Sequence, residues 1–343
     1  MRTRVFVIIV IASLFPILIQ AQGNGSACDR ACLEKFVDRY MDAMAAHDPG
    51  SLFAKDAKFT ENGVKLPLGE GLWSSIAGKG TYQFYVPDVE TQQIGFIGTA
   101  REENEKGGSD PVGIALRLKI VGGKIAEAEQ LVLRGEAGWQ NTVGASLEKM
   151  AHPHPVFGEI IPAGERPSRE EMIHTANYYF AGIQQNDGKG YYPFTDDCDR
   201  VENGEKATNV PLKPGEKMPD PKTSLVYSSA WSCKQQFESG LIHFVSRVRD
   251  RRFVAVDRER GVVFSFAFFD HGAGKTRTFQ APDGRTVTAG PTTPWTWQIA
   301  ELFKIEKGKI RKIEAVLMRC PYGMNSGWST YEQGMSDQIQ SIR

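Results

Sequence analysis

Acidic and amide side chains recur at one point in each half of the sequence, in the tripeptides Glu61-Asn62-Gly63 and Glu202-Asn203-Gly204. A carboxylate beside an amide at the mouth of a cavity has the chemistry of a general base with an orienting hydrogen-bond donor. The same tripeptide also fits a tight turn whose glutamate caps a neighbouring helix. Recurrence in both halves suits either interpretation, so the sequence leaves both open.

The second half of the chain carries further titratable groups. Asp270 and His271 end the apolar segment 262–269, and they form no dyad by themselves because strand neighbours face opposite sides of a sheet. His271 is a candidate acid or base if another carboxylate orients it. Arg319 is a candidate clamp for an anion or a carbonyl oxygen. We therefore expect Glu202, Asp270, His271 and Arg319 to be catalytic, with a structural strand-end histidine and a sheet-edge arginine as the plainer alternatives.

A second group of residues is expected to bind the ligand, because each could place a polar or aromatic group at the cavity of its own copy. These candidates are Tyr178, Asn203, His243, Glu61, Asn62, Trp73 and Arg134. No metal site is expected, since the segment 152–154 (His-Pro-His) lacks a third ligand and no paired CxxC motif occurs. The segment 271–276 (HGAGKT) departs from a phosphate-binding loop, which requires glycine where this chain has Phe269. No cofactor is expected.

The sequence contains two copies of one unit, which must position these residues. Residues 114–134 and 299–319 share nine of 21 residues at a constant offset of 185, and each predicts a hairpin with a glycine turn. Asp48 matches Asp187 at an offset of 139, so the offset grows along the chain and the second copy carries insertions. Apolar residues at helical spacing precede both aspartates, which predicts an amphipathic helix at the start of each copy.

The predicted order of elements is a helix, a strand, a further helical segment and a run of antiparallel strands, which indicates an α+β fold. We place the first domain at 28–134, a connection rich in glycine and proline at 135–166, and the second domain at 167–330.

The segments CDRACLEKFVDRY (28–40), TENGVKLPLGEGLW (60–73) and CDRVENG (198–204) carry a resemblance to known proteins. They are similar to an uncharacterised family of secreted tandem SnoaL-like proteins from bacteria and fungi, within the nuclear-transport-factor-2-like fold. The resemblance implies two tandem cones, each a curved antiparallel sheet wrapped around its N-terminal helix to enclose an apolar cavity. For function it implies isomerase, lyase or cyclase chemistry, or non-catalytic binding, as in the wider superfamily.

The beginning of the chain predicts export. Residues 1–21 combine Arg2 and Arg4, an apolar run at 5–19 and a small residue at the expected cut, which is typical of a secretory signal. A retained membrane anchor is the alternative, disfavoured because the run is short and Pro16 interrupts it. We expect a secreted, periplasmic or extracellular protein that does not contact a membrane after signal removal.

The five cysteines fit an oxidising compartment. We predict one disulfide between Cys198 and Cys233, which flank a long insertion, and a second between Cys28 and Cys32. A frayed first helical turn would be needed for the second pairing, because four residues on a helix are a strained span for a disulfide. Cys320 is expected to lie outside both.

Composition and charge limit the class of function. Hydrophobic residues make up 41% of the chain, and 41 basic residues balance 41 acidic ones. The chain is therefore globular and lacks the basic field that nucleic-acid binding needs. The leading hypothesis is a cofactor-independent enzyme that isomerises, eliminates from or cyclises a small, partly apolar organic molecule in the second domain. The alternatives are a module that binds such a molecule unchanged, and a structural pair of domains with filled cavities; a homodimer is left open.

Overall fold

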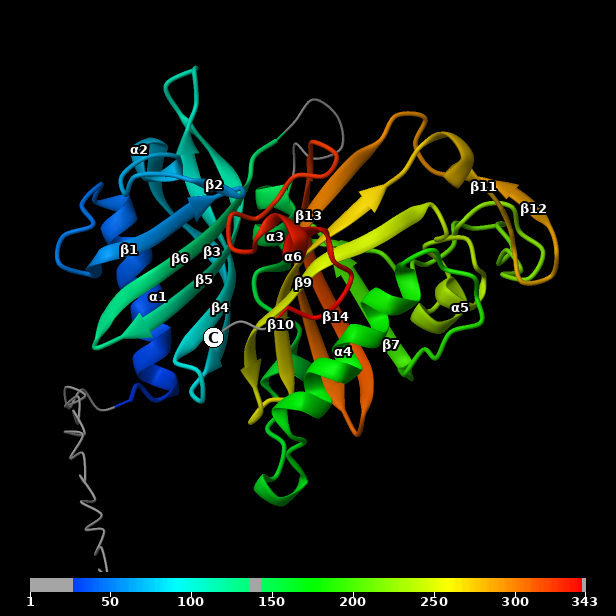
Figure 1. Ribbon diagram of the computed structural model, residues 1–343, viewed down its shortest axis with the longest axis horizontal. Helices are drawn as coiled ribbons and strands as arrows, with labels where there is room; N and C mark the ends of the chain where they lie inside the picture. The colour runs from blue at the N-terminus through cyan, green and yellow to red at the C-terminus, as the bar shows by residue number, and fades with distance from the viewer. Residues whose placement is uncertain (1–26, 136–142, 341–343) are drawn as a thin grey trace, which may run out of the picture.

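The computed structural model describes residues 27–135 and 143–340. The predicted signal at 1–21 and residues 136–142 of the predicted connection lie outside the described residues. The described chain forms two α+β domains, each built on a six-stranded mixed sheet (Figure 1). The predicted α+β class and the internal duplication are therefore confirmed. The sheets are not purely antiparallel as expected, because the first long strand of each domain pairs in parallel with the last.

The first domain places a helix against its sheet. Its elements are α1 (Arg30–Ala45), β1 (Phe53–Glu61), β2 (Val64–Lys65), α2 (Leu72–Ser75), β3 (Ile76–Asp88), β4 (Gln93–Glu103), β5 (Ser109–Val121) and β6 (Lys124–Leu133). The strand order is β2-β1-β6-β5-β4-β3, with β1 parallel to β6 and the other pairs antiparallel. Asp29 caps α1 by accepting from Cys32 N, and the apolar face that begins at Leu33 packs into the domain core.

The second domain repeats this topology strand by strand. Its elements are α4 (Arg169–Ile183), β7 (Phe194–Glu202), β8 (Glu205–Lys206), α5 (Cys233–Glu238), β9 (Val245–Asp257), β10 (Val262–His271), η3 (Gly274–Arg277), β11 (Thr278–Gln280), β12 (Thr286–Thr288), β13 (Trp295–Glu306) and β14 (Lys309–Cys320). The strand order is β8-β7-β14-β13-β10-β9, again with the first long strand, β7, parallel to the last, β14. The predicted hairpins are β5–β6 and β13–β14.

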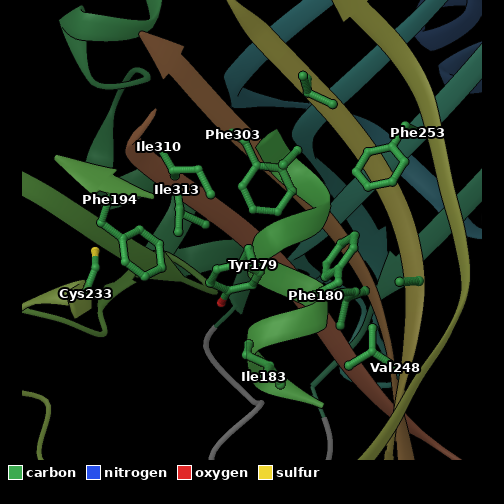
Figure 2. Packing of buried hydrophobic residues seen from close by; sticks show 14 of the residues in the cluster. Tyr179, Phe180, Ile183, Phe194, Cys233, Val248, Phe253, Phe303, Ile310 and Ile313 are labelled. Atoms are coloured by element: carbon green, nitrogen blue, oxygen red, sulfur yellow. The ribbon is translucent and has the colours of Figure 1, made fainter. Parts of the chain in front are cut away.

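The core of the second domain forms around α4. Tyr179, Phe180 and Ile183 project from this helix among buried side chains of the sheet (Figure 2). Tyr179 and Phe180 point to different sides of the helix, with Phe194 on the side of Tyr179 and Val248 on the side of Phe180 (Figure 2). The helical spacing of its apolar residues therefore positions Tyr179 against the sheet, where the site described below is built.

Two insertions distinguish the second domain. Residues 207–244 separate β8 from β9 and contain α5, and residues 272–294 separate β10 from β13 and contain the β11–β12 hairpin (Figure 1). The predicted disulfide Cys198–Cys233 is present and ties the first insertion to β7. The Cys28–Cys32 disulfide is also present, and α1 begins only at Arg30, after the first of these cysteines. Cys320 is buried and lies outside both disulfides.

The predicted connection has more structure than its composition indicated. It contains α3 (Val143–Met150), η1 (Pro155–Gly158) and η2 (Ala163–Glu165). Leu147 of α3 is fully buried in an apolar cluster shared by the two domains. An eight-residue helix gives only two turns of periodicity, which is why the pattern did not stand out. Within the described residues, no helix has both the length and the apolar character needed to cross a membrane.

The chain after β14 runs back toward the first domain, and the ordered structure continues into α6, beyond the predicted boundary at 330. Trp328 Nε1 donates to Thr60 Oγ1 at 2.8 Å, and α6 (Tyr331–Met335) packs on the second domain near β9 (Figure 1). The C-terminal segment therefore links both domains.

The two domains contact one another through equivalent residues. Arg30, the first residue of α1, binds Asp257 at 2.6 Å, and Arg169, the first residue of α4, binds Asp88 in return. Between these pairs the sheets approach so closely that a Cβ at Gly95 would lie 2.6 Å from the ring of Phe264. The duplicated units thus pack as an internal pair with reciprocal ion pairs.

Candidate functional site

The repeated asparagines fasten one turn of each domain to a neighbouring strand through hydrogen bonds. Asn62 directly follows β1 and Asn203 directly follows β7, and both have a positive φ, as the tight turn requires. Asn203 accepts from Leu317 N at 2.9 Å and donates to Leu317 O at 3.1 Å, and Asn62 makes the same two bonds to Val132 at 2.8 and 3.3 Å. These bonds attach the turn to the neighbouring parallel strand, which favours the turn interpretation for both predicted ligand-binding asparagines.

Glu61 also has a structural environment. Its carboxylate accepts from Leu72 N at 2.8 Å at the start of α2, as the capping alternative predicted, and from Arg134 Nη1 at 2.9 Å. Arg134 also binds Glu102 at 2.8 Å. These contacts occupy both side chains in one structural cluster, so Glu61 and Arg134 are not part of the site that we propose.

The interior of the first domain is filled beside these residues. Tyr40 Oη accepts from Trp73 Nε1 at 3.1 Å and donates to Gln130 Oε1 at 2.9 Å. Gln130 Nε2 in turn donates to Glu61 Oε2 at 3.1 Å. Trp73 is 1% exposed and lies edge-on to the ring of Tyr40. Trp73 is therefore a core residue rather than a ligand-binding one.

The second domain instead contains a partly open cavity of about 110 Å³ between α4, the first insertion and the sheet. Its lining is mostly apolar and is made by Tyr179, Ile183, Arg200, Glu202, Tyr227, Ile242, Phe244, Val245, Phe269, Trp297, Ile299, Glu301, Ala315 and Leu317. Of the predicted residues, only Glu202 lines it. The cavity fits the expectation that the second domain holds the site.

Arg200 organises the polar end of this cavity. It is 5% exposed, and its Nη1 donates to Tyr179 Oη at 3.0 Å. Its Nη2 donates to Tyr227 Oη at 2.6 Å and to Gln236 Oε1 at 2.9 Å, while Nε lies 3.1 Å from the carboxylate of Glu202. A buried guanidinium with this number of partners is fixed in place, and its charge is balanced by Glu202.

Glu301 is the second carboxyl group in the cavity. It is 1% exposed, and burial, followed by the nearby charge of Glu202, raises its pKa to about 8 against the opposing effect of Arg200. Tyr179 hydrogen-bonds to the carboxyl group, whereas Glu301 Oε2 has no hydrogen-bond partner among the described residues. At neutral pH, Glu301 is therefore mostly a neutral acid that can donate its proton to an acceptor in the cavity.

Arg200 and Glu301 were missed because they do not stand out in a single copy. Glu301 lies in an apolar stretch of β13, whereas Arg200 lies among the charged residues of β7, and the first domain has Phe59 and Leu116 at the equivalent positions. A third difference is Ala315, which replaces Gln130 and leaves space beside Tyr179. Comparing the copies for charges that replace apolar residues would have identified both side chains.

Other predicted residues lie near the cavity without lining it. His271 is buried, stacks on Trp295 with ring centroids 3.9 Å apart, and donates from Nδ1 to Phe269 O at 3.0 Å. Burial lowers its pKa to about 4, so it is neutral at pH 7. Arg319 is exposed and lies over the ring of Trp295. Neither residue touches the polar end of the cavity formed around Arg200.

Asp270 faces away from the cavity, as strand alternation requires for the neighbour of Phe269. Its fully buried carboxylate binds Arg247 at 2.6 Å, Arg249 at 2.9 Å and Thr296 Oγ1 at 2.7 Å. These contacts satisfy the carboxylate and attach β10 to β9 and β13. The predicted catalytic role of Asp270 therefore does not enter the proposed site.

The two remaining predicted ligand-binding residues also lie elsewhere. Tyr178 is 43% exposed on the outer side of α4 and packs edge-on against Tyr191. His243 Nδ1 contacts Asn186 O at 3.1 Å, and its ring stacks on Phe279. Adjacent helix positions differ by about 100° in direction, which is why Tyr178 points outward and Tyr179 into the core.

The arrangement in the second domain is suited to acid–base chemistry on a small molecule. Glu202 is an ion-paired carboxylate, whereas Glu301 is a neutral acid, and the two line one cavity. An ion-paired carboxylate beside a neutral carboxylic acid can supply the base and the acid of one reaction. Among residues 27–135 and 143–340, no group of three or more His, Cys, Asp or Glu side chains is arranged to hold a metal ion.

Comparisons with known proteins add little about chemistry. A crystal structure of a protein from Sphaerobacter thermophilus is 14% identical, with a TM-score of 0.23, and the match covers 29% of this chain and 94% of that one. A de novo designed protein with a curved β-sheet is also 14% identical, with a TM-score of 0.24, over 44% of this chain and 88% of that one. No curated protein matches the sequence. Residues 165–317, which span most of the second domain, match the family model described as "Domain of unknown function (DUF8021)".

Proposed function

We propose that this protein is a secreted enzyme that moves a proton within a small, neutral carbonyl compound in the cavity of the second domain. The reaction class is isomerisation, elimination or ring closure, carried out by the carboxyl and phenol groups of the chain. The single observation behind this proposal is Glu301, a buried acid with a pKa of about 8 beside the ion-paired carboxylate of Glu202.

The proposed reaction begins when the Glu202 carboxylate removes a proton from the carbon next to the carbonyl group. The electrons of the broken C–H bond move to the carbonyl oxygen, where the O–H of Glu301 donates a hydrogen bond to the developing negative charge. In an isomerisation Glu202 returns the proton to a different carbon. In an elimination a leaving group departs from the next carbon with the electron pair. Arg200 and Tyr179 hold the two carboxyl groups in position.

The size and the charge of the cavity limit which substrates it can accept. An apolar cavity of roughly 150 Å³ holds benzene, and this space of about 110 Å³ is partly open, so it accepts about one ring with a short substituent that extends through the open side. The charges of Arg200 and Glu202 cancel and Glu301 is neutral, so an ionised group placed here would lack a counter-charge. A neutral ketone or aldehyde satisfies both conditions and supplies the acceptor that Glu301 Oε2 lacks.

The proposed biological setting follows from the sequence. The signal-like residues 1–21 and the two disulfides support export to a periplasmic or extracellular space. The duplicated α+β units and the segments at 28–40, 60–73 and 198–204 support membership of a secreted tandem SnoaL-like family with cone-shaped domains. No nucleic-acid partner is proposed, because basic and acidic residues balance.

The proposal is tested by incubating the mature protein with a mixed pool of small neutral ketones, aldehydes and enones. Mass spectrometry would then compare the products with those of a heat-denatured sample. We expect one compound to be converted into an isomer or an elimination product. Glu202→Gln, Glu301→Leu and Tyr179→Phe should each remove most of this conversion, and Tyr178→Phe, the exposed neighbour, should not.

Two outcomes would overturn the enzyme proposal. Retention of a compound unchanged on the native protein would make the cavity a binding site without chemistry. Conversion that survives both Glu202→Gln and Glu301→Leu would place the reaction elsewhere in the chain.

A further inference from the structure

A second hollow adjoins the polar end of the cavity on the outside of the second domain. This outer depression has a volume of about 300 Å³ and is lined in part by Glu205, Lys206 and Ser229. Arg200, Glu202 and Tyr227 line both the outer depression and the inner cavity. The two hollows therefore lie on opposite sides of one shared wall.

The shared wall has one part that is not built into the sheet. Arg200 and Glu202 belong to β7, whereas Tyr227 lies in the first insertion and is half-buried. Two bonds within the insertion close a loop that contains Tyr227, since Val210 N donates to Ser229 O at 3.0 Å and Trp231 Nε1 donates to Pro219 O at 2.6 Å. A ligand that reached from one hollow into the other would pass beside the Tyr227 ring.

The chemistry of the outer depression differs from that of the inner cavity. Its lining is more polar, with Glu205 and Lys206 of opposite charge in addition to the balanced Arg200–Glu202 pair. Glu205 already accepts from Ser146 Oγ at 2.9 Å, and Lys206 lies 3.8 Å from Asp199. Such a surface has no net charge to attract an ion, and it presents a few polar groups, such as Ser229 and Glu205, beside apolar atoms. This combination suits a neutral group that carries hydroxyls on a carbon ring.

We infer that the two hollows form one binding site for a carbonyl compound whose head occupies the inner cavity and whose neutral, hydroxyl-rich tail, such as a sugar, occupies the outer depression. This inference rests on the proposed function and names the class of its substrate. Tyr227 then separates the two parts of the ligand, and the residues around Ser229 select the tail.

Four small probes test the inference by calorimetry on the mature protein. Acetophenone supplies the head, methyl β-D-glucoside the tail, 4-acetylphenyl β-D-glucoside both, and 4-acetylphenyl phosphate a head with a charged tail. We expect the glucoside with both parts to bind about ten-fold tighter than acetophenone, which corresponds to about 1.4 kcal/mol. The phosphate should gain nothing over acetophenone.

A variant pair locates the tail. Ser229→Trp fills the outer depression from an exposed position and should abolish the gain from the sugar while leaving the affinity for acetophenone unchanged. Leu225→Trp, at another exposed position of the same insertion, should change neither affinity.

The results separate the two proposals. If acetophenone binds and Glu301→Leu weakens its binding, but the sugar adds no affinity in the wild-type protein, the two-part site is wrong and the proposed function stands. An unchanged sugar effect in Ser229→Trp also overturns the two-part site. If acetophenone itself does not bind, the proposed function fails and this inference fails with it.

Discussion

The buried carboxyl group of Glu301 makes the stability of the protein depend on pH in a calculable way. Its pKa is about 8 in the folded protein and 4.5 in an ordinary exposed glutamate. Between these values the folded chain keeps the proton and the unfolded chain releases it. The unfolded state therefore binds fewer protons, and the contribution of Glu301 to stability falls as the pH rises.

Replacing Glu301 by glutamine isolates this effect. The amide has nearly the same shape and can keep the hydrogen bond to Tyr179, but it does not titrate. Each pH unit between the two pKa values changes the free energy of unfolding by about 1.4 kcal/mol, so wild type should lose about 3 kcal/mol relative to Glu301→Gln between pH 5 and pH 7. Other buried groups, such as Glu314, contribute equally to both proteins and cancel in the comparison.

Urea unfolding of both proteins at these two pH values measures the difference directly. In a thermal scan the same change corresponds to a relative shift in Tm of roughly 6–12 °C for a domain of this size. A difference between wild type and Glu301→Gln that is the same at both pH values would refute the reasoning. Glu301 would then titrate as an ordinary carboxyl group, and its role as a neutral acid would be lost.

Three further predictions concern packing and hydrogen bonds. Ala315→Gln introduces into the cavity the side chain that Gln130 has at the equivalent position of the first domain. The affinity for acetophenone, measured by calorimetry, should fall at least about ten-fold. An unchanged affinity would show that the cavity is not the site. Asn203→Ala leaves two buried backbone groups of β14 without partners, so urea unfolding should show a loss of about 3 kcal/mol; a loss below about 1 kcal/mol would contradict this role. Glu129→Gln breaks the two 2.7 Å bonds that the Glu129 carboxylate forms with Arg252 of the other domain. The free energy of unfolding should fall by about 3 kcal/mol, at the low end for a buried pair, because Asp250 still lies 3.2 Å from the Arg252 guanidinium. A urea unfolding curve like that of wild type would argue against this role.

Much of the fold could be predicted because the chain contains its topology twice. The hairpins at 114–134 and 299–319 and the helix before each domain follow from periodicity that two copies repeat. The turn at Asn203 could be anticipated as one of two interpretations, and its bonds to Leu317 favour that one. The reciprocal contact between Arg30 and Asp257 could not be predicted, since no local pattern specifies which surfaces of two domains meet.

The site was only partly predictable for a physical reason. Glu202 was recognised because its tripeptide recurs, although recurrence itself argued for a structural role. Glu301 lies in a strand whose nearest neighbours are apolar, and Arg200 lies in a strand with several charged residues. In neither strand does the local pattern mark that one charge as buried. Conversely, Asp270 and His271 attracted attention as titratable neighbours, but alternation sends them to opposite faces, and the contacts of Asp270 are those of a structural ion pair.

The most direct test of the central claim is deuterium incorporation into acetophenone in D2O near neutral pH, followed by mass spectrometry. Removal of a proton next to the carbonyl group, as proposed for Glu202 with Glu301 as the acid, predicts deuterium in the methyl group with the wild-type protein. Glu202→Gln and Glu301→Leu should reduce this incorporation to that of the buffer, and Tyr178→Phe should not. Incorporation by wild type no faster than in buffer, despite binding of acetophenone in the cavity, would contradict the account.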